Sequence, residues 1–184
     1  LLVVWTIVPS GQQVWAQMMR VLLGQTEVEL TPTLEAPSYA VREPLPNLVA
    51  AEVMMGRAPA VPRTLPENYV LHEGVGVSYP ALPSWISQPF FIELGYGPED
   101  GRPVLYLREY RLLFREQGGI TAFEPSSQNV DRMQEVDVSG APGAMITFQN
   151  AAQTVIWERD GLLLELESDR LPAETLLMVA RSTR

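Results

Sequence analysis

Few side chains in this sequence could support metal chemistry. His72 is the only histidine and there is no cysteine, so thiolate zinc sites, cysteine nucleophiles and disulfides are excluded together. A calcium loop needs alternating acidic residues that end in glutamate, and Glu99-Asp100-Gly101 is too short for one. We therefore predict no metal site, and we expect His72 to be an ordinary strand residue and the acidic pair to belong to a turn.

Nucleophilic and phosphate-binding motifs are also missing. Ser10-Gly11 and Ser139-Gly140 do not form a Gly-x-Ser-x-Gly elbow, and a catalytic triad would depend on His72 alone. Gly74-x-Gly76 and Gly95-x-Gly97 lack the third glycine and the following helix of a phosphate-binding loop.

Paired carboxylates are the last catalytic candidates. Glu158 and Glu165 are expected to be neighbours on one strand face, which is the arrangement of residues that a glycosidase uses. In a chain with 22 acidic residues, such a pair is more simply part of a solvated surface. The sequence thus predicts no catalytic residues and no cofactor, and we expect that the protein is not an enzyme.

Aromatic residues remain as candidates for binding. They could line an apolar cavity between a curved sheet and its helices, or they could form an ordinary packed core. Their spacing does not separate these alternatives. The aromatic set is Trp85, Phe90, Phe91, Tyr106, Tyr110, Phe114 and Trp157, and all except Phe90 are taken as the candidate ligand or partner face.

The clearest structural pattern lies near the C-terminal end of the sequence. Two predicted strands, 154–159 and 162–167, flank Asp160-Gly161, a dipeptide that favours a type I′ hairpin turn. A two-residue turn places Trp157 opposite Leu164 on an apolar face and directs the glutamates to the other face. Pro172 then starts a helix whose apolar stripe can cover that apolar face.

Further strands are predicted at 69–79, 89–96, 104–114, 133–138 and 144–148. In the segment 104–114, Arg108 shares a face with the aromatic residues, and Glu109 lies on the opposite face. Gly74 and Gly76 suggest a β-bulge. These patterns predict an α+β fold: a curved, meander-like antiparallel sheet of six or seven strands, with helices packed on its concave face.

Composition limits the partners of the protein. Of 184 residues, 46% are hydrophobic, which is enough for a substantial core, and the net charge is −9. This charge argues against binding to nucleic acid or to anionic lipid surfaces. Sixteen prolines and 13 glycines favour a β-rich fold with many turns.

The N-terminal region divides into segments of different character. Residues 1–8 are apolar and too short to cross a bilayer, which takes about 20 residues; they fit a buried strand or the end of a membrane-proximal or transmembrane segment. Residues 9–24 read as an amphipathic helix, packed on its own domain or lying beside the membrane. Residues 25–47 read as a proline-rich linker or strap, and residues 48–184 as the main domain, which opens with a short helix capped by Asn47.

Three stretches resemble the extracytoplasmic domain of membrane-anchored bacterial anti-sigma factors. Residues 8–17 are similar to the Pro-x-Gly-x-x-x-Ala-Gln juncture outside the membrane span, and residues 62–69 to the Leu-Pro-Glu-Gly-Tyr segment, with Asn68 in place of glycine. The last strands and the helix at 171–182 are similar to the ending of that family, Leu-x-x-Glu-x-Leu-x-x-x-Ala-x-Ser.

The resemblance implies a fold similar to outer-membrane lipoprotein carriers and to periplasmic regulators of sigma-E signalling. It implies a single-pass protein whose C-terminal domain lies on the extracytoplasmic side of the cell membrane. Its function would be sensing or interaction with a protein partner, without catalysis. The alternative is a carrier-like domain that binds a lipid or lipoprotein in an apolar cavity, and a filled core would favour the interaction domain.

Overall fold

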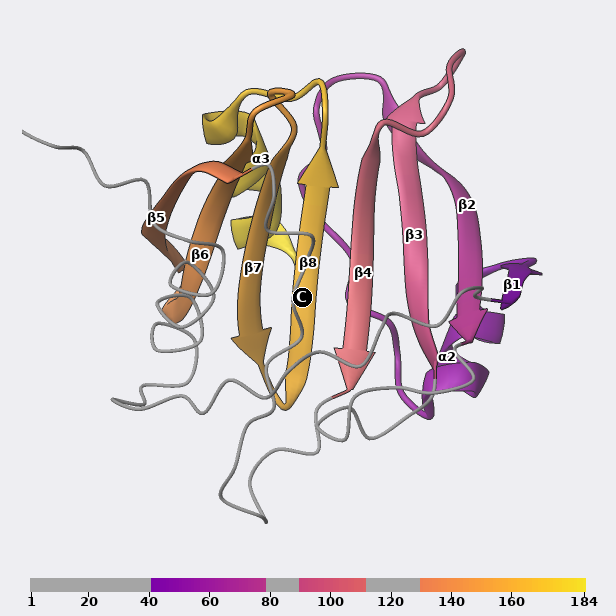
Figure 1. The fold of residues 1–184 in the computed structure, drawn as a ribbon. Coiled ribbons are helices and arrows are strands. Elements are labelled where there is room, and N and C mark those ends of the chain that lie inside the picture. Colours follow the sequence, from indigo (N-terminus) through magenta and orange to yellow (C-terminus); the bar gives the residue numbers. More distant parts are fainter. Residues whose placement is uncertain (1–40, 79–89, 112–129) are drawn as a thin grey trace, which may run out of the picture.

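The body of the molecule is an open sheet of eight strands (Figure 1). The computed structural model describes residues 41–78, 90–111 and 130–184, and there every pair of neighbouring strands is antiparallel. The predicted antiparallel sheet with helices is thereby confirmed. The elements are β1 (Val41–Leu45), α2 (Leu48–Met55), β2 (Tyr69–Ser78), β3 (Phe90–Pro98), β4 (Leu105–Arg111), β5 (Val130–Val138), β6 (Ala141–Phe148), β7 (Gln153–Arg159), β8 (Leu162–Ser168) and α3 (Ala173–Ser182).

The order of the strands corrects the predicted meander. Along the sheet the order is β1-β2-β3-β4-β8-β7-β6-β5, so β8 rather than β5 lies beside β4. Strands β1 to β4 and strands β5 to β8 each form a consecutive antiparallel run, and the two runs join at β4 and β8. The number of strands is also corrected, from six or seven to eight.

The additional strand, β1, lies within the segment 25–47 that we expected to be a linker or strap. It pairs with β2 from Val41 opposite Ser78 to Leu45 opposite Gly74, at the edge of the sheet. Pro44 has no N–H to donate, and an edge strand tolerates such a residue. A high proline content is therefore compatible with an edge strand as well as with a linker.

Complementary side chains explain why β8 pairs with β4. Arg108 lies opposite Glu165, and Leu107 lies opposite Leu166, so opposite charges and apolar side chains meet across the two strands. Strand β5 carries exposed charged residues such as Asp131, which suit the edge of a sheet.

The C-terminal hairpin has the register that its sequence predicts. Asp160 and Gly161 have φ values of 54° and 75°, as a type I′ turn requires. Trp157 lies opposite Leu164, and the apolar and acidic faces follow from this register. The hairpin between β5 and β6 is tighter than expected, because its turn contains only residues 139 and 140.

Both predicted helices of the described region are present. Asn47 caps α2, its side-chain Oδ1 accepting a hydrogen bond from the Ala50 N–H at 3.0 Å. Gly56 ends α2 in the left-handed conformation. Helix α3 follows Pro172, as predicted.

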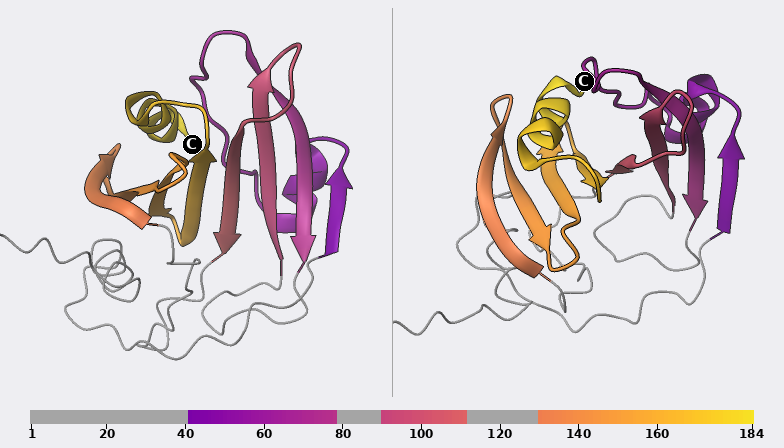
Figure 2. Two further views of the ribbon diagram at one scale, coloured as in Figure 1. Left: turned by 45° about the horizontal axis from the view of Figure 1, so that its top comes forward. Right: turned by 90° about the horizontal axis from the view of Figure 1, so that it is seen from above.

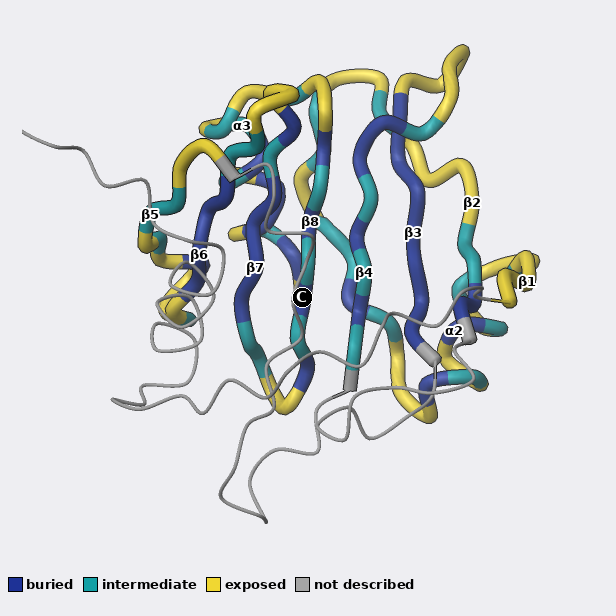
Figure 3. The backbone as a smooth tube through the Cα atoms, in the orientation of Figure 1, coloured by how far each residue is buried: buried dark blue, intermediate teal, exposed yellow. Residues whose placement is uncertain are grey.

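The two helices share one core with one face of the sheet, and Figure 2 shows the sheet and helices from two further directions. Figure 3 shows buried residues along β3 and β7 and exposed residues along β1. Large apolar side chains fill the core, so close packing stabilises the fold. They include Met55, Leu94, Leu107, Trp157, Leu164, Leu166, Leu176 and Val179.

The glycines of β2 have a role other than the predicted bulge. The register shift between β2 and β3 lies at Leu71 and Glu73, before both glycines. A Cβ atom at Gly76 would lie 2.7 Å from the sulfur of Met54, and one at Gly74 would lie 3.5 Å from Cβ of Leu45. Gly76 therefore gives room to the Met54 side chain of α2, whereas a Cβ atom at Gly74 would make ordinary contact with Leu45.

The predicted segments 1–8 and 9–24, and residues 25–40 of the predicted linker, lie outside the described residues. Among the residues that the structure describes, no helix is long and apolar enough to cross a membrane.

Candidate functional site

The structure gathers three of the six aromatic residues predicted as a ligand or partner face. Phe91 on β3 and Tyr106 and Tyr110 on β4 share one face of the sheet, as their registers require. The rings of Phe91 and Tyr110 pack with their centroids 4.6 Å apart. Trp85 and Phe114 lie outside the described residues.

Trp157 lies on the opposite face of the sheet. It pairs with Leu164 of β8, whereas Tyr110 pairs with Leu163, and successive residues of a strand point to opposite faces. Trp157 is completely buried in the core that the helices share. Trp157 is therefore a core residue, and the sheet separates it from Phe91, Tyr106 and Tyr110.

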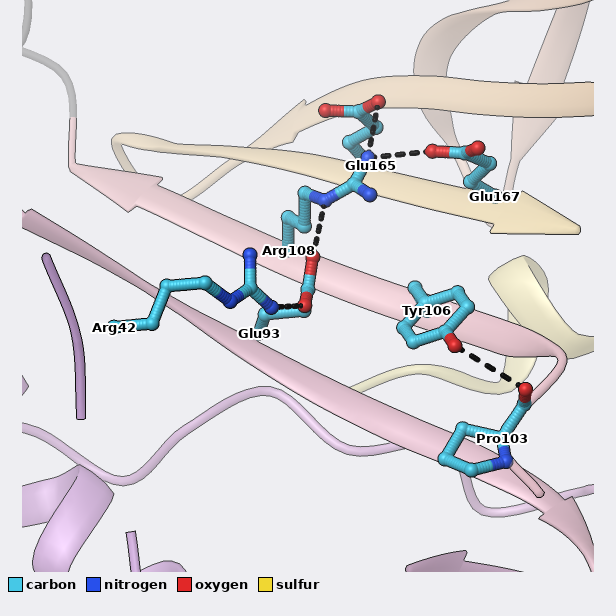
Figure 4. Close-up of polar contacts among 7 residues, drawn as sticks. All are labelled: Arg42, Glu93, Pro103, Tyr106, Arg108, Glu165 and Glu167. Carbon is cyan, nitrogen blue, oxygen red and sulfur yellow. Dashed lines mark hydrogen bonds and ion pairs between the residues drawn. The ribbon is translucent and has the colours of Figure 1, made fainter. Parts of the chain in front are cut away.

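A network of charged side chains lies on the face of the sheet that carries Phe91, Tyr106 and Tyr110. Figure 4 shows these charged side chains with Tyr106. At the centre of the network, Arg108 of β4 donates from Nε to Glu93 of β3 at 2.7 Å. Its Nη1 donates to Glu165 at 3.0 Å and to Glu167 at 2.6 Å, both on β8. We call these residues, together with Arg42, the Arg108 network.

Arg42 extends the Arg108 network to the edge strand β1. Its Nη2 donates to Oε1 of Glu93, whose side chain is only 5% exposed. Tyr110 adds a hydrogen bond of 3.2 Å from its hydroxyl group to Glu165. The network thus connects β1, β3, β4 and β8, which include the two strands at which the halves of the sheet meet.

Tyr106 lies beside the network without joining it. Its hydroxyl group donates to the carbonyl oxygen of Pro103 at 3.2 Å, away from the glutamates (Figure 4). Tyr106 and Glu167 also line a pocket of about 330 Å³ that contains Arg102 and Ser168. The charged face therefore has a neighbouring hollow with mixed polar and apolar walls.

Pairing and burial shift the pKa values of the glutamates in opposite directions. Burial raises the pKa of Glu93, but hydrogen bonds and charge from Arg108 and Arg42 outweigh burial, and the pKa lies below the ordinary value of 4.5. Burial raises the pKa of Glu165 above its ordinary value, and Arg108 opposes this shift only in part. Burial lowers the pKa of Arg108, but the charges of Glu165 and Glu167 outweigh it and raise the pKa overall.

This arrangement suits binding and strand pairing better than proton transfer. Each of the three glutamates already accepts a hydrogen bond from a guanidinium group. A general base must instead lie within hydrogen-bond reach of a substrate proton, and a substrate would have to displace the arginine first.

The other predicted chemical candidates lie apart from the Arg108 network. His72 is exposed on β2, and its Nε2 is 2.8 Å from the carbonyl oxygen of Pro98. Glu99 and Asp100 lie in the turn between β3 and β4, as predicted. Among the described residues, no group of three or more histidine, cysteine or acidic side chains could hold a metal ion.

The Arg108 network leaves a partial signal in the sequence, which is not enough to predict it. Glu165 and Glu167 alternate on one face of a predicted strand, and Arg108 lies in the middle of another predicted face. The pairing of β4 with β8 brings these residues together across 57 positions of sequence. No local pattern indicates that pairing, so the sequence by itself predicts a solvated acidic surface.

Comparison of the chain with protein-family models, with curated proteins and with solved structures gives no significant match.

Proposed function

We propose that residues 41–184 form a non-enzymatic sensor or interaction domain of a membrane-anchored, anti-sigma factor-like regulator. The domain would lie outside the cell membrane, and its sheet would bend around the two helices as in lipoprotein carriers. A ligand, a partner or proteolysis would change this domain, and the segment 9–24 would transmit the change toward the membrane. The resemblance of residues 8–17, 62–69 and 171–182 to that family motivates the proposal.

The observation that carries the proposal is the Arg108 network. It places three glutamates and two arginines beside Phe91 and Tyr110, and it pairs these charges with one another. Arg42 and Glu167 are its more exposed members, with side chains 53% and 35% exposed, so these are the charges that a partner would contact. The same pairing makes the glutamates poor acid–base catalysts.

The filled core supports an interaction domain over a lipid carrier. Trp157, Leu164 and Leu176 are almost completely buried and belong to one cluster that connects the sheet with α3. A carrier would need an apolar cavity in the place that these side chains occupy.

Transcript measurements on the intact gene test the proposal. The codons for residues 41–184 are deleted in frame in the native organism, and RNA is sequenced from the parent and from the deletion strain. We expect transcripts from one set of promoters with a shared recognition sequence to change, because the upstream segment loses its control.

Two controls make the result interpretable. Immunoblotting of a tag at the N-terminus must show that the truncated protein is present in the membrane fraction. In a strain that lacks the cognate sigma factor, transcript levels should be the same with the intact gene and with the gene that lacks codons 41–184. Unchanged transcripts in a strain that contains the truncated protein would refute the proposed function.

A further inference from the structure

A pocket of about 420 Å³ lies at the end of the molecule where α3 stops. Side chains from four separate parts of the chain line it: the segment after α2, the β5–β6 turn, the β7–β8 hairpin and the end of α3. Its size is within the range of small-molecule sites. We call it the arginine pocket, after Arg57, Arg159, Arg181 and Arg184 in its wall.

Backbone carbonyl groups hold two of these arginines in place. Arg159 donates to the carbonyl oxygens of Thr183 at 2.5 Å and of Val138 at 3.0 Å. Arg181 donates from Nε to the carbonyl oxygen of Asp137 at 2.9 Å. Because carbonyl groups carry no net charge, these hydrogen bonds orient the guanidinium groups without neutralising them.

Backbone hydrogen bonds join two of the segments that form the pocket wall, the segment after α2 and the end of α3. An antiparallel bridge joins Pro62 to Thr183, and the Val61 N–H donates to the carbonyl oxygen of Arg184 at 3.0 Å. Arg57 lines the pocket and lies in the segment that leads to this bridge, so the bridge fixes that segment beside the end of α3. Binding to a site whose walls are already in place costs less ordering entropy.

The charge of the arginine pocket contrasts with that of the Arg108 network. Arg108 and Arg42 are paired with three glutamates. Among the described residues, no carboxylate lies within ion-pair distance of the four pocket arginines, and Asp160 is the one acidic residue in the pocket wall. Four arginines thus line one pocket with a single acidic residue in its wall, and buried Glu109 outside the wall acts electrostatically on Arg57 alone among them.

We propose that the arginine pocket binds a small organic anion, with a carboxylate or phosphate group among the arginines and an apolar body against the pocket floor. Guanidinium groups bind carboxylate and phosphate oxygens through paired hydrogen bonds. Ala60, Leu162 and Leu164 provide the apolar floor, and Ser139 adds a hydroxyl group. This site lies apart from the face described above and would exist whether or not the domain controls an anti-sigma segment.

Calorimetric titration of the purified protein with matched aromatic probes tests the site. The probes are benzoate, phenyl phosphate, the neutral benzyl alcohol and the cation benzylamine, which share one ring and differ in charge. We expect saturable binding of benzoate or phenyl phosphate that weakens as salt is added, and no binding of the neutral or cationic probe. Comparison of the two anions shows whether the site prefers carboxylate or phosphate.

A pair of arginine variants tests the location. Arg57 lines the pocket and Arg63 does not, yet both are exposed, lie in one connecting segment and lose the same charge on substitution. Arg57→Gln should weaken anion binding about tenfold, as expected for loss of one charge-assisted hydrogen bond. Arg63→Gln should bind like the unmodified chain. Three results would overturn the proposal: equal affinities of the two variants, binding of benzyl alcohol as strong as that of benzoate, or no anion binding at low salt.

Discussion

At the scale of single residues, Arg108 is the side chain on which the charged face depends. A guanidinium group has donors in several directions, so one arginine can serve glutamates on two neighbouring strands. Of the three glutamates, Glu93 depends most on a paired guanidinium group, because its side chain is only 5% exposed and is poorly solvated. Removal of Arg108 leaves Glu93 with Arg42 alone and deprives Glu165 and Glu167 of their guanidinium partner. The loss of one member of a buried charge network exceeds the net contribution of the intact network.

Replacement of Arg108 should therefore destabilise the fold in a pH-dependent way. We expect Arg108→Met to lower the free energy of unfolding by about 3 kcal/mol at neutral pH. The pKa of Glu93 is lowered in the folded state, so ionised Glu93 stabilises the fold fully above pH 4.5. This stabilisation is lost as the pH falls through the folded-state pKa of Glu93. The difference between variant and unmodified chain should shrink below that pH. Urea unfolding followed by circular dichroism measures it.

Arg170→Gln is the matched control for that experiment. Arg170 lies 3.9 Å from Asp169, and both side chains are more than half exposed. An exposed pair of this kind contributes about 0.5 kcal/mol or less. A loss for Arg108→Met no larger than that of the control would contradict the role assigned to the Arg108 network.

Glu109 is a second buried acid, on the opposite face of β4. Its Oε2 accepts a hydrogen bond from the Ala60 N–H at 2.7 Å, which fastens the segment after α2 to the sheet. No described group donates to its Oε1. Burial raises the pKa of Glu109, and the Ala60 N–H and Arg57 oppose this shift only in part.

The raised pKa predicts the opposite pH dependence for Glu109. The carboxyl group of Glu109 holds its proton more tightly in the folded state than in the unfolded chain. The contribution of Glu109 to stability therefore falls as the pH rises from 4.5 toward its folded-state pKa. Glu109→Gln cannot ionise, and it should therefore gain stability relative to the unmodified chain as the pH rises. Urea unfolding of both proteins at a series of pH values gives this difference, and a difference independent of pH would contradict the assignment.

At the scale of elements, local signals predicted the ends of α2 and the turn of the C-terminal hairpin. Asn47 and Gly56 limit α2, and Asp160-Gly161 fixes the register of β7 and β8, because each acts on neighbouring backbone groups. The function of a glycine depends instead on what packs against it, and sequence does not show that. The suggested irregularity of β2 is present, but it lies at Leu71 and Glu73 rather than at Gly74 and Gly76.

Two strand glycines should differ in their tolerance of alanine. A Cβ atom at Gly97 would overlap the backbone oxygen of Arg102, whereas one at Gly76 would meet the flexible end of Met54. We expect Gly97→Ala to cost about 2 kcal/mol, and Gly76→Ala to cost clearly less because Met54 can change rotamer. Thermal unfolding of the two variants gives the comparison. A larger loss for Gly76→Ala would show that the space around these glycines is wrongly assigned.

At the scale of the whole molecule, the junction of β4 with β8 organises the sheet. Sequence patterns identified seven of the eight strands and the helices of the described region, because each has its own periodicity or turn signal. They did not identify which strands pair across the middle of the sheet, since the segments are far apart in the chain. The Arg108 network and the arginine pocket depend on such distant pairings, so neither could be predicted.

Reporter fusions test most directly the proposal that residues 41–184 act outside the cell membrane. Alkaline phosphatase or green fluorescent protein is fused after Arg184 of the full-length gene product and expressed in the native organism. We expect phosphatase activity without fluorescence, because alkaline phosphatase becomes active outside the cytoplasm and the fluorescent protein folds inside it. Fluorescence without phosphatase activity would place the domain in the cytoplasm and contradict the account.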